Sequence, residues 1–412
     1  MNRVAVTGTG IVSAIGADVA AFTAALRAGR TGIVATPDGL GAPVTDWSFP
    51  EAVAGAPAPL RRRAQRSAGR SPRPVRVAVA AAVQAWTAAR LTDSPIPGDR
   101  VGVVVAGHNL TARYVHDLRP GWEENPAYLP ARFALHALDT DHVGTLSEVF
   151  DATGEGCTVG GASASGNVGV VHATRLVASG TVDCCLLVGA LCELTPLHRR
   201  AFAVLGALAE PTSDPGRACR PFDRDRSGFV PGEAAAALVL ESTASATRRG
   251  VPHRAVVAGH ALALDGDRSA APNLDGEVRV IRAALAAAGL APTDVDYVNA
   301  HATASRRGDE VEAAALVAAL GAGVDRAFVN STKALTGHCL GAAGVVEAVA
   351  TVAQLCGGFV HPTPNLDDPV EPRLRFVGPV ARPADLRYAL SNGFGFGGIN
   401  SAVVLARTPD EG

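Results

Sequence analysis

The hydrophobic and polar positions of this 412-residue chain form short, nearly continuous apolar runs separated by stretches that favour helices. Residues 4–7 and 101–106 are apolar at almost every position, which is typical of strands in a sheet covered on both faces. The string Gly8–Thr9–Gly10 follows the first run and predicts a turn there. Residues 77–91 repeat Ala and Val at helical spacing. This alternation predicts an α/β protein.

Two parts of the chain share the same layout. Residues 157–161 predict a strand followed by a helix over 163–179, and residues 327–330 predict a strand followed by a helix over 341–355. Each block is followed by further apolar, strand-like runs, at 183–190 and 234–240 after the first and at 388–391 and 401–406 after the second. The layout indicates an internal duplication into two βαβ-type halves packed in layers.

Composition narrows the class of protein. Hydrophobic residues make up 48% of the chain, charged residues 18%, and the net charge is -2, so a sizeable core is expected and neither nucleic acid nor a membrane surface is an expected partner. We expect no apolar run to cross a bilayer, and we expect no secretory signal before the first strand. The seven cysteines show no CxxC spacing and predict reduced thiols in a cytoplasmic protein.

Ser163 lies in the first candidate site, the string Gly160–Gly161–Ala162–Ser163–Ala164–Ser165–Gly166 at a predicted strand-to-helix turn. Backbone N–H groups at such a helix start favour negative charge. A cysteine there would be an activated thiolate, whereas a serine needs an adjacent base in order to attack. The plain alternative is a serine N-cap in a turn rich in Gly and Ala.

His301 follows a predicted strand at residues 295–298, where functional groups of α/β proteins gather. The alternative is a structural histidine with its hydrogen bonds satisfied. Lys333 and His338 flank a turn before the apolar helix, and a surface loop is the alternative there. Glu347 inside that helix would be a buried carboxylate in need of a partner, for which Lys333 is the candidate.

The last candidate is the string Asn392–Gly393–Phe394–Gly395–Phe396–Gly397–Gly398–Ile399–Asn400, hereafter the Gly-rich loop. Four glycines around two phenylalanines expose backbone N–H groups, which could form an oxyanion site. The alternative is an ordinary hairpin turn. No metal or nucleotide motif is visible in the sequence.

In this order, the four segments resemble the β-ketoacyl synthase family over essentially the whole chain. Shorter strings also resemble that family, at residues 4–16, 220–223, 228–233 and 308–312. The resemblance implies a thiolase-like α/β fold with five αβαβα layers and two pseudo-duplicated halves. Residues 1–250 would form the half that carries Ser163. Residues 251–412 would form the half that carries the histidines, Lys333 and the Gly-rich loop.

The resemblance also implies roles for single residues. The family's nucleophilic cysteine falls on Ser163, and its two active-site histidines fall on His301 and His338. Its lysine falls on Lys333 and its buried glutamate on Glu347. The phenylalanine that gates the pocket and lends a backbone N–H falls on Phe396, and the remaining substrate-binding positions are Thr303, Ser305 and Gly397.

A serine in place of the cysteine is the departure that suggests a function. Condensation needs an acyl thioester on the enzyme, whereas the histidines stabilise the enolate that forms when malonyl loses CO2. The string around Ser163 is most similar to the ketosynthase-like decarboxylases of polyketide β-branching cassettes. These work with a hydroxymethylglutaryl-CoA-synthase-like enzyme and convert malonyl-acyl carrier protein to acetyl-acyl carrier protein. A second departure is Ala302–Thr303, where the family usually has Gly-Thr.

The resemblance implies an acyl carrier protein as partner, the phosphopantetheine arm of that carrier as the only cofactor, and a homodimer. Seven arginines between residues 61 and 76 either dock the acidic carrier or form a solvated helix face. Two other functions stay open. One is a non-catalytic partner subunit of the chain-length-factor type, although such subunits usually lose the histidine motifs kept here. The other is a serine-dependent acyltransferase.

Overall fold

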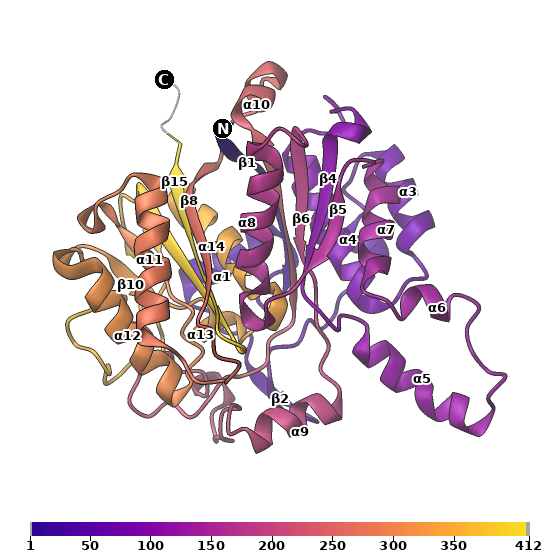
Figure 1. Cartoon of the computed structure of the whole chain (residues 1–412). Coiled ribbons are helices and arrows are strands. Elements are labelled where there is room, and N and C mark those ends of the chain that lie inside the picture. The colour runs from indigo at the N-terminus through magenta and orange to yellow at the C-terminus, as the bar shows by residue number, and fades with distance from the viewer. Residues whose placement is uncertain (1, 409–412) are drawn as a thin grey trace.

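The computed structural model describes residues 2–408, which form five alternating layers of helices and strands (Figure 1). Eleven strands join in one sheet with the order β12-β10-β9-β14-β15-β8-β1-β7-β6-β4-β5. The first and second halves of the chain supply opposite ends of this sheet. The thiolase-like α/β fold expected from the sequence is therefore present.

Strands from the first half follow one pairing pattern. In sheet order these strands are β1 (Val4–Ser13), β7 (Ala234–Ser242), β6 (Cys184–Gly189), β4 (Val101–Ala106) and β5 (Gly156–Val159). Strand β1, the first along the chain, pairs antiparallel with β7, the last along the chain. Strand β7 also pairs antiparallel with β6, and the pairs β6–β4 and β4–β5 are parallel.

Strands from the second half repeat that pattern. They are β8 (Ala255–Leu264), β15 (Ile399–Arg407), β14 (Tyr388–Gly395), β9 (Tyr297–Asn299), β10 (Phe328–Asn330) and β12 (Arg375–Phe376). A short antiparallel contact between β1 and β8 joins the halves, with Val4 opposite Val257. The repeated pattern is the internal duplication predicted from the sequence.

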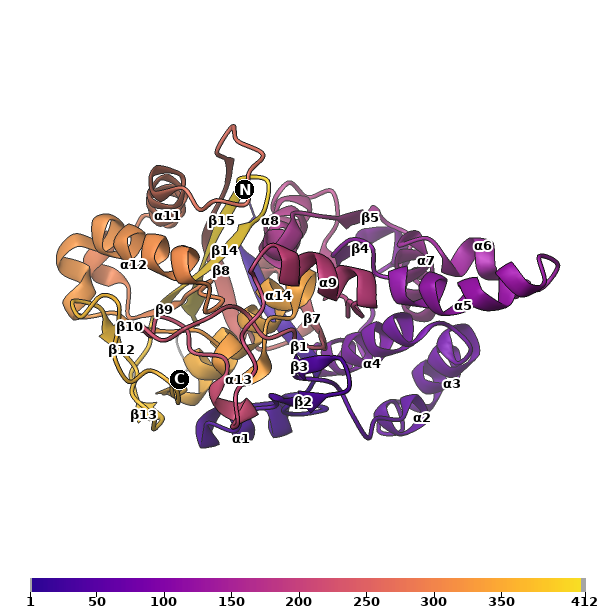
Figure 2. The same ribbon diagram turned by 90° about the horizontal axis from the view of Figure 1, so that it is seen from below.

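Helices cover both outer faces of the sheet and fill the space between its halves (Figures 1 and 2). The outer helices are α3 (Ala58–Ala68), α4 (Arg73–Ala88) and α7 (Thr140–Phe150) on one side, and α11 (Leu274–Ala288) and α12 (Arg306–Leu320) on the other. The middle layer holds α1 (Val19–Ala28), α8 (Ser165–Ala178) and α14 (Ala343–Gly357).

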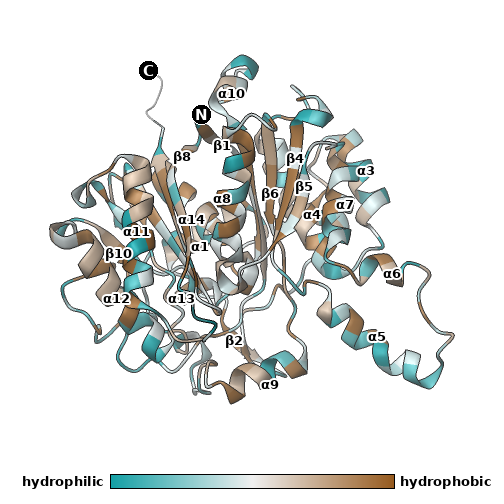
Figure 3. Cartoon of the chain, viewed as in Figure 1, coloured by the Kyte–Doolittle hydropathy of each residue, from teal (hydrophilic) through white to brown (hydrophobic). Residues whose placement is uncertain are grey.

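The middle layer is the apolar centre of the molecule, as the hydropathy colouring shows (Figure 3). Residues Leu340–Gly357, which include α14, are long and apolar enough to cross a membrane, yet 78% of this stretch is buried inside the protein. The helix contacts α8 and strands of both halves. Its apolar sequence is thus explained by its central position.

Gly8 and Gly10 do not form the predicted turn, because β1 continues to Ser13. Both glycines lie against α4 so closely that a Cβ atom would be 2.0 Å from Ala85 O or Ala81 O, respectively. The glycines permit close packing of strand and helix rather than a change of direction.

Further elements connect these layers. They are α2 (Phe49–Ala52), α5 (Ala112–Glu124), α6 (Phe133–His136), α9 (Pro196–Val204), α10 (Thr243–Arg249), α13 (Lys333–Thr336), β2 (Val34–Thr36), β3 (Gly39–Gly41), β11 (Phe359–Val360) and β13 (Arg382–Pro383). Helices α5 and α6 lie on an arm that projects from the body beside α7 (Figure 1).

Candidate active site

Ser163 lies on a single 3-10 turn, Ala162–Ala164, between β5 and α8. The preceding residue, Ala162, has a φ of 48°, a left-handed conformation that is uncommon for a residue with a side chain. Ser165 stabilises the turn, since its Oγ accepts from Gly161 N at 2.8 Å and donates to Ala162 O at 2.7 Å. Ser163 caps neither this turn nor α8, so the N-cap alternative is wrong.

The Ser163 side chain contacts His338 from the other half of the chain. Oγ lies 2.8 Å from Nε2 of the imidazole. The His338 backbone is fixed at both of its polar atoms, because its N donates to Val230 O at 2.7 Å and its O accepts from Gly232 N at 2.9 Å. The ring of Phe229 packs edge-on against the imidazole, with 5.3 Å between centroids. His338 is therefore held in one position beside the serine.

His301 completes a pair of facing imidazoles. Its ring is perpendicular to that of His338, with 5.8 Å between centroids. Glu312 fixes the loop that carries it, because this buried carboxylate accepts from His301 N at 2.8 Å and from Ala302 N at 2.7 Å. Glu312 also accepts from Asn392 Nδ2 at 3.0 Å, which ties the His301 loop to β14.

Lys333 and Glu347 form the buried ion pair that the sequence predicts, and the structure confirms this contact. Burial raises the pKa of the Glu347 carboxyl to about 7, and Lys333 opposes that rise. Burial also lowers the pKa of both His301 and His338 well below their usual range, and the charge of Lys333 lowers each pKa further. Both imidazoles are therefore neutral near pH 7.

The Gly-rich loop lies against the Ser163 turn. A Cβ atom on Gly395 would be only 2.3 Å from Gly161 O, so glycine is required for this approach. The Phe394 ring packs against His301 with 5.6 Å between centroids, while the next aromatic, Phe396, is 45% exposed. The role of Phe396 as a gate stays a prediction. The alternative of a hairpin turn holds, since β14 and β15 form a hairpin here.

Three further residues were predicted to bind substrate. Thr303 and Ser305 are half-buried between His301 and α12. Gly397 does not offer its N–H to an oxyanion, because that group already donates to Ser269 O at 3.1 Å. Its φ of 88° explains the glycine instead.

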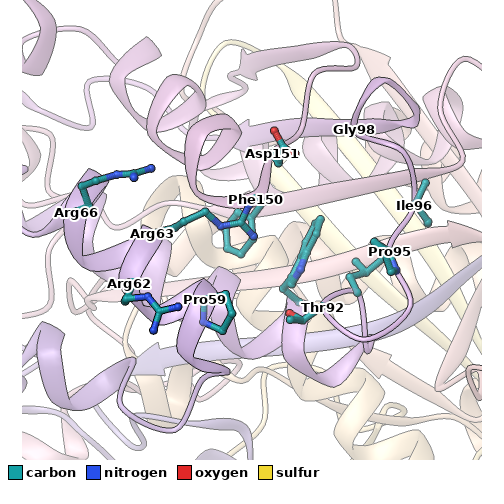
Figure 4. Close-up of a pocket in the computed structure, with 12 residues that line it drawn as sticks. Pro59, Arg62, Arg63, Arg66, Thr92, Pro95, Ile96, Gly98, Phe150 and Asp151 are labelled. Atoms are coloured by element: carbon teal, nitrogen blue, oxygen red, sulfur yellow. The ribbon is translucent and has the colours of Figure 1, made fainter.

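Three arginines of α3 line a groove that does not include Ser163. The groove has a volume of about 750 Å³ (Figure 4) and is lined by Pro59, Arg62, Arg63, Arg66, Trp86, Leu91, Thr92, Pro95, Ile96, Gly98, Phe150 and Asp151. Gly98 precedes β4, whereas the other end of β4 leads to Gly107, which packs against Gly341 near His338. The groove thus lies at the end of β4 remote from Ser163, and carrier docking there stays a prediction.

Family models match the chain over most of its length. The model described as "Beta-ketoacyl synthase, N-terminal domain" matches residues 1–246, and the corresponding "C-terminal domain" model matches residues 254–367. The chain belongs to the β-ketoacyl synthase family. The two ranges include Ser163, both histidines, Lys333 and Glu347, but not the Gly-rich loop.

Two curated relatives align with nearly the full length of the chain. This chain is 36% identical to a polyketide biosynthesis malonyl-ACP decarboxylase, PksF, of Bacillus subtilis, over 98% of this chain and 96% of that protein. It is 33% identical to a 3-oxoacyl-[acyl-carrier-protein] synthase 2 of Vibrio cholerae, over 98% and 99%. The relatives thus include a decarboxylase and condensing enzymes.

Solved structures agree on the fold. A β-ketoacyl synthase from Burkholderia phymatum superposes with a TM-score of 0.87 at 30% identity, covering 99% of this chain and 100% of the other. The ishigamide ketosynthase/chain length factor superposes with a TM-score of 0.85 at 30% identity, covering 99% of both chains.

Proposed function

We propose that this ketosynthase decarboxylates malonyl-acyl carrier protein to acetyl-acyl carrier protein without forming a carbon–carbon bond. One observation carries the proposal: a serine occupies the nucleophile position while two neutral histidines and a buried lysine keep their places around it. The 36% identity to a malonyl-ACP decarboxylase supports the same activity.

In the proposed step, the bond between Cα and the carboxylate of malonyl breaks and CO2 leaves. The electron pair moves onto the thioester as an enolate, whose oxygen accepts hydrogen bonds from the Nε2–H groups of His301 and His338. Such preorganised donors stabilise charge that develops in the transition state. Solvent then supplies one proton to Cα, which gives the acetyl thioester.

Ser163 explains the absence of condensation in this proposal. A serine hydroxyl does not ionise readily, so it needs a base that is itself oriented by a third group. The Nδ1 atom of His338 is buried without a hydrogen-bond partner among residues 2–408, so that third group is missing. The Ser163 hydroxyl instead keeps a hydrogen bond with Nε2 of His338 until a substrate oxygen takes its place.

The same proposal includes the cellular setting. The substrate would arrive on the phosphopantetheine arm of an acyl carrier protein, and the enzyme itself would need no cofactor. The acetyl product would supply β-branching by a hydroxymethylglutaryl-CoA-synthase-like enzyme in the cytoplasm. Six free thiols, at Cys157, Cys184, Cys185, Cys192, Cys219 and Cys339, support a reducing compartment.

We also propose a homodimer that forms across β5. This strand is the last in the sheet, so one of its edges has no partner strand. The adjacent arm exposes large apolar side chains, at Trp122, Tyr128, Leu135 and Leu138, which a second copy would cover. Sedimentation equilibrium would show a dimer, and Trp122→Glu would shift it towards the monomer. A wild-type monomer would contradict the proposal.

The activity is tested by incubating the purified protein with malonyl-loaded carrier and weighing the carrier by mass spectrometry. Loss of CO2 is expected with the wild type. His301→Ala should slow it by about 10²–10³-fold, because one oxyanion donor is removed. Unchanged malonyl-carrier with both proteins would reject the decarboxylase and favour a non-catalytic partner subunit.

A further inference from the structure

One segment, residues 220–232, connects the loops of the two histidines. At its end, Val230 and Gly232 make the backbone hydrogen bonds that hold His338. At its start, Phe222 N donates to the buried Asp309 carboxylate at 2.8 Å, on the helix that follows the His301 loop. A buried arginine, Arg226, lies between these two ends.

Arg226 uses its guanidinium to bind the backbone. Nε donates to Ser305 O at 3.1 Å, Nη1 donates to Asp223 O at 2.8 Å, and Nη2 donates to Arg306 O. Nη2 also bonds Glu310 Oε1 at 2.9 Å. The side chain is only 2% exposed, so these contacts have replaced water around the charge.

The turn at Ala304–Ser305 is not stabilised by its own side chains. Ala304 has a φ of 66°, which is strained for a residue with a Cβ. Ser305 is the N-cap of α12 but makes no capping hydrogen bond with its side chain. Hydrogen bonds from Arg226 to the carbonyls of Ser305 and Arg306 therefore stabilise a turn that the local sequence does not favour.

We propose that Arg226 is a positioning residue that sets the place of His301 opposite His338 by holding the backbone at Ser305 and Arg306. This inference rests on the proposed decarboxylation. Arg226 contacts neither imidazole, so it acts through the backbone at Ser305 and Arg306. Displacement of the loop by about 1 Å would cost on the order of 10²-fold in rate.

The test compares Arg226→Ala with Arg249→Ala in the full-length protein. Arg249 is a matched control, since it is also buried and also binds a carboxylate and backbone carbonyls: Glu241, Ser94 O and Ala89 O. It lies beside Glu241, near the end of β7 opposite His338. Melting temperature, kcat and KM on malonyl-carrier are measured for both variants, with and without guanidinium at concentrations far below those that unfold the protein.

Arg226→Ala should lower kcat/KM by about 10²-fold, with a lower kcat and a higher KM, and free guanidinium should restore much of the loss. Arg249→Ala should lower the melting temperature and leave kcat and KM unchanged. Should Arg226→Ala fail to fold, Arg226→Lys takes its place, and it should stay slow because an ammonium cannot form the same fork of hydrogen bonds.

Two results overturn the inference. One is an Arg226 variant with reduced stability but wild-type kcat and KM. The other is an equal kinetic loss in the Arg226 and Arg249 variants without rescue by guanidinium. An inactive wild type would reject the decarboxylase itself. In that case comparison of the His301 and His338 ring signals by NMR in wild type and Arg226→Lys still tests positioning: shifted His301 signals support it, and unchanged signals contradict it.

Discussion

Ser163 Oγ and His338 Nε2 lie 2.8 Å apart although 175 positions separate the two residues in the chain. The contact joins the two halves at the helix start where a condensing enzyme would carry its thiolate. Because the pKa of His338 is lowered by burial and by Lys333, the contact is between neutral groups at pH 7. Neutral imidazoles can donate Nε2–H hydrogen bonds to an enolate oxygen, as the proposed decarboxylation requires.

Changing the serine separates decarboxylation from acyl transfer. Ser163→Ala should keep decarboxylation within about tenfold of the wild type, because both histidines stay in place. Ser163→Cys should gain a covalent acyl group, because a thiol at a helix start beside a histidine forms a thiolate. The mass of malonyl-loaded carrier measures decarboxylation, and the intact mass of the enzyme after incubation with acyl-carrier measures acyl transfer. An acyl adduct on wild-type Ser163 during turnover would favour the acyltransferase alternative.

The charge of Lys333 should set the pH profile. Wild-type decarboxylation should stay level as the pH falls from about 8 to about 6, because the pKa values of both histidines lie well below the ordinary 6.5. Lys333→Met removes a cation that lowers those values, so protonation of both histidines, and the change in rate that accompanies it, should move to higher pH. Glu347→Gln, which breaks the same ion pair but keeps the lysine, should retain the wild-type profile. A pH profile of Lys333→Met identical to that of the wild type would disprove the coupling between the Lys333 charge and the histidines.

Glu277 should make stability depend on pH. Burial raises its pKa to about 10, and the charges of Glu312, Asp265 and Asp309 add to the rise. Between the unfolded value of about 4.3 and 10, the folded protein keeps a proton that the unfolded chain releases. Stability should therefore fall by up to about 1.4 kcal/mol per pH unit as the pH rises. Glu277→Gln should remove this slope in denaturant unfolding between about pH 6 and about pH 9. An equal slope in both proteins would contradict the assignment.

Glu312 should be required for both stability and rate. Glu312→Ala leaves the N–H groups of His301 and Ala302 without an acceptor, which should cost about 1–3 kcal/mol for each. The free His301 loop should also slow decarboxylation. Glu312→Gln keeps one acceptor oxygen and should lie between the wild type and the alanine variant. Urea unfolding and initial rates measure the two effects, and wild-type rates in Glu312→Ala would exclude the positioning role.

Local patterns predicted much of the fold. The apolar run at Val101–Ala106 is the strand β4 with the same limits, because a strand buried on both faces has an unbroken apolar sequence. The prediction of a turn at Gly8 and Gly10 was wrong, because the sequence does not distinguish a glycine needed for close packing against a helix from one needed for a turn. The Lys333–Glu347 pair was predictable because a carboxylate in an apolar helix needs a partner.

Long-range contacts were not predictable from these patterns. The distance between Ser163 and His338 depends on how the two halves pack, and the local sequence around either residue does not determine that packing. Arg226 was missed because it stands in a charged string, Arg224–Asp225–Arg226, that looks exposed. Only the fold reveals that one of these side chains is buried against the His301 loop. The engagement of the Gly397 N–H was not predictable for a similar reason, since this group donates to Ser269 O from another loop.

The most direct test of decarboxylation without condensation is a single reaction in D2O with malonyl-carrier and an acyl-carrier acceptor, followed by mass spectrometry of both carriers and the enzyme. The account predicts acetyl-carrier with one deuterium on its methyl group, because solvent protonates the enolate. It also predicts an unchanged acceptor and an enzyme without an acyl group. A condensation product on the carrier, or unreacted malonyl-carrier, would contradict it.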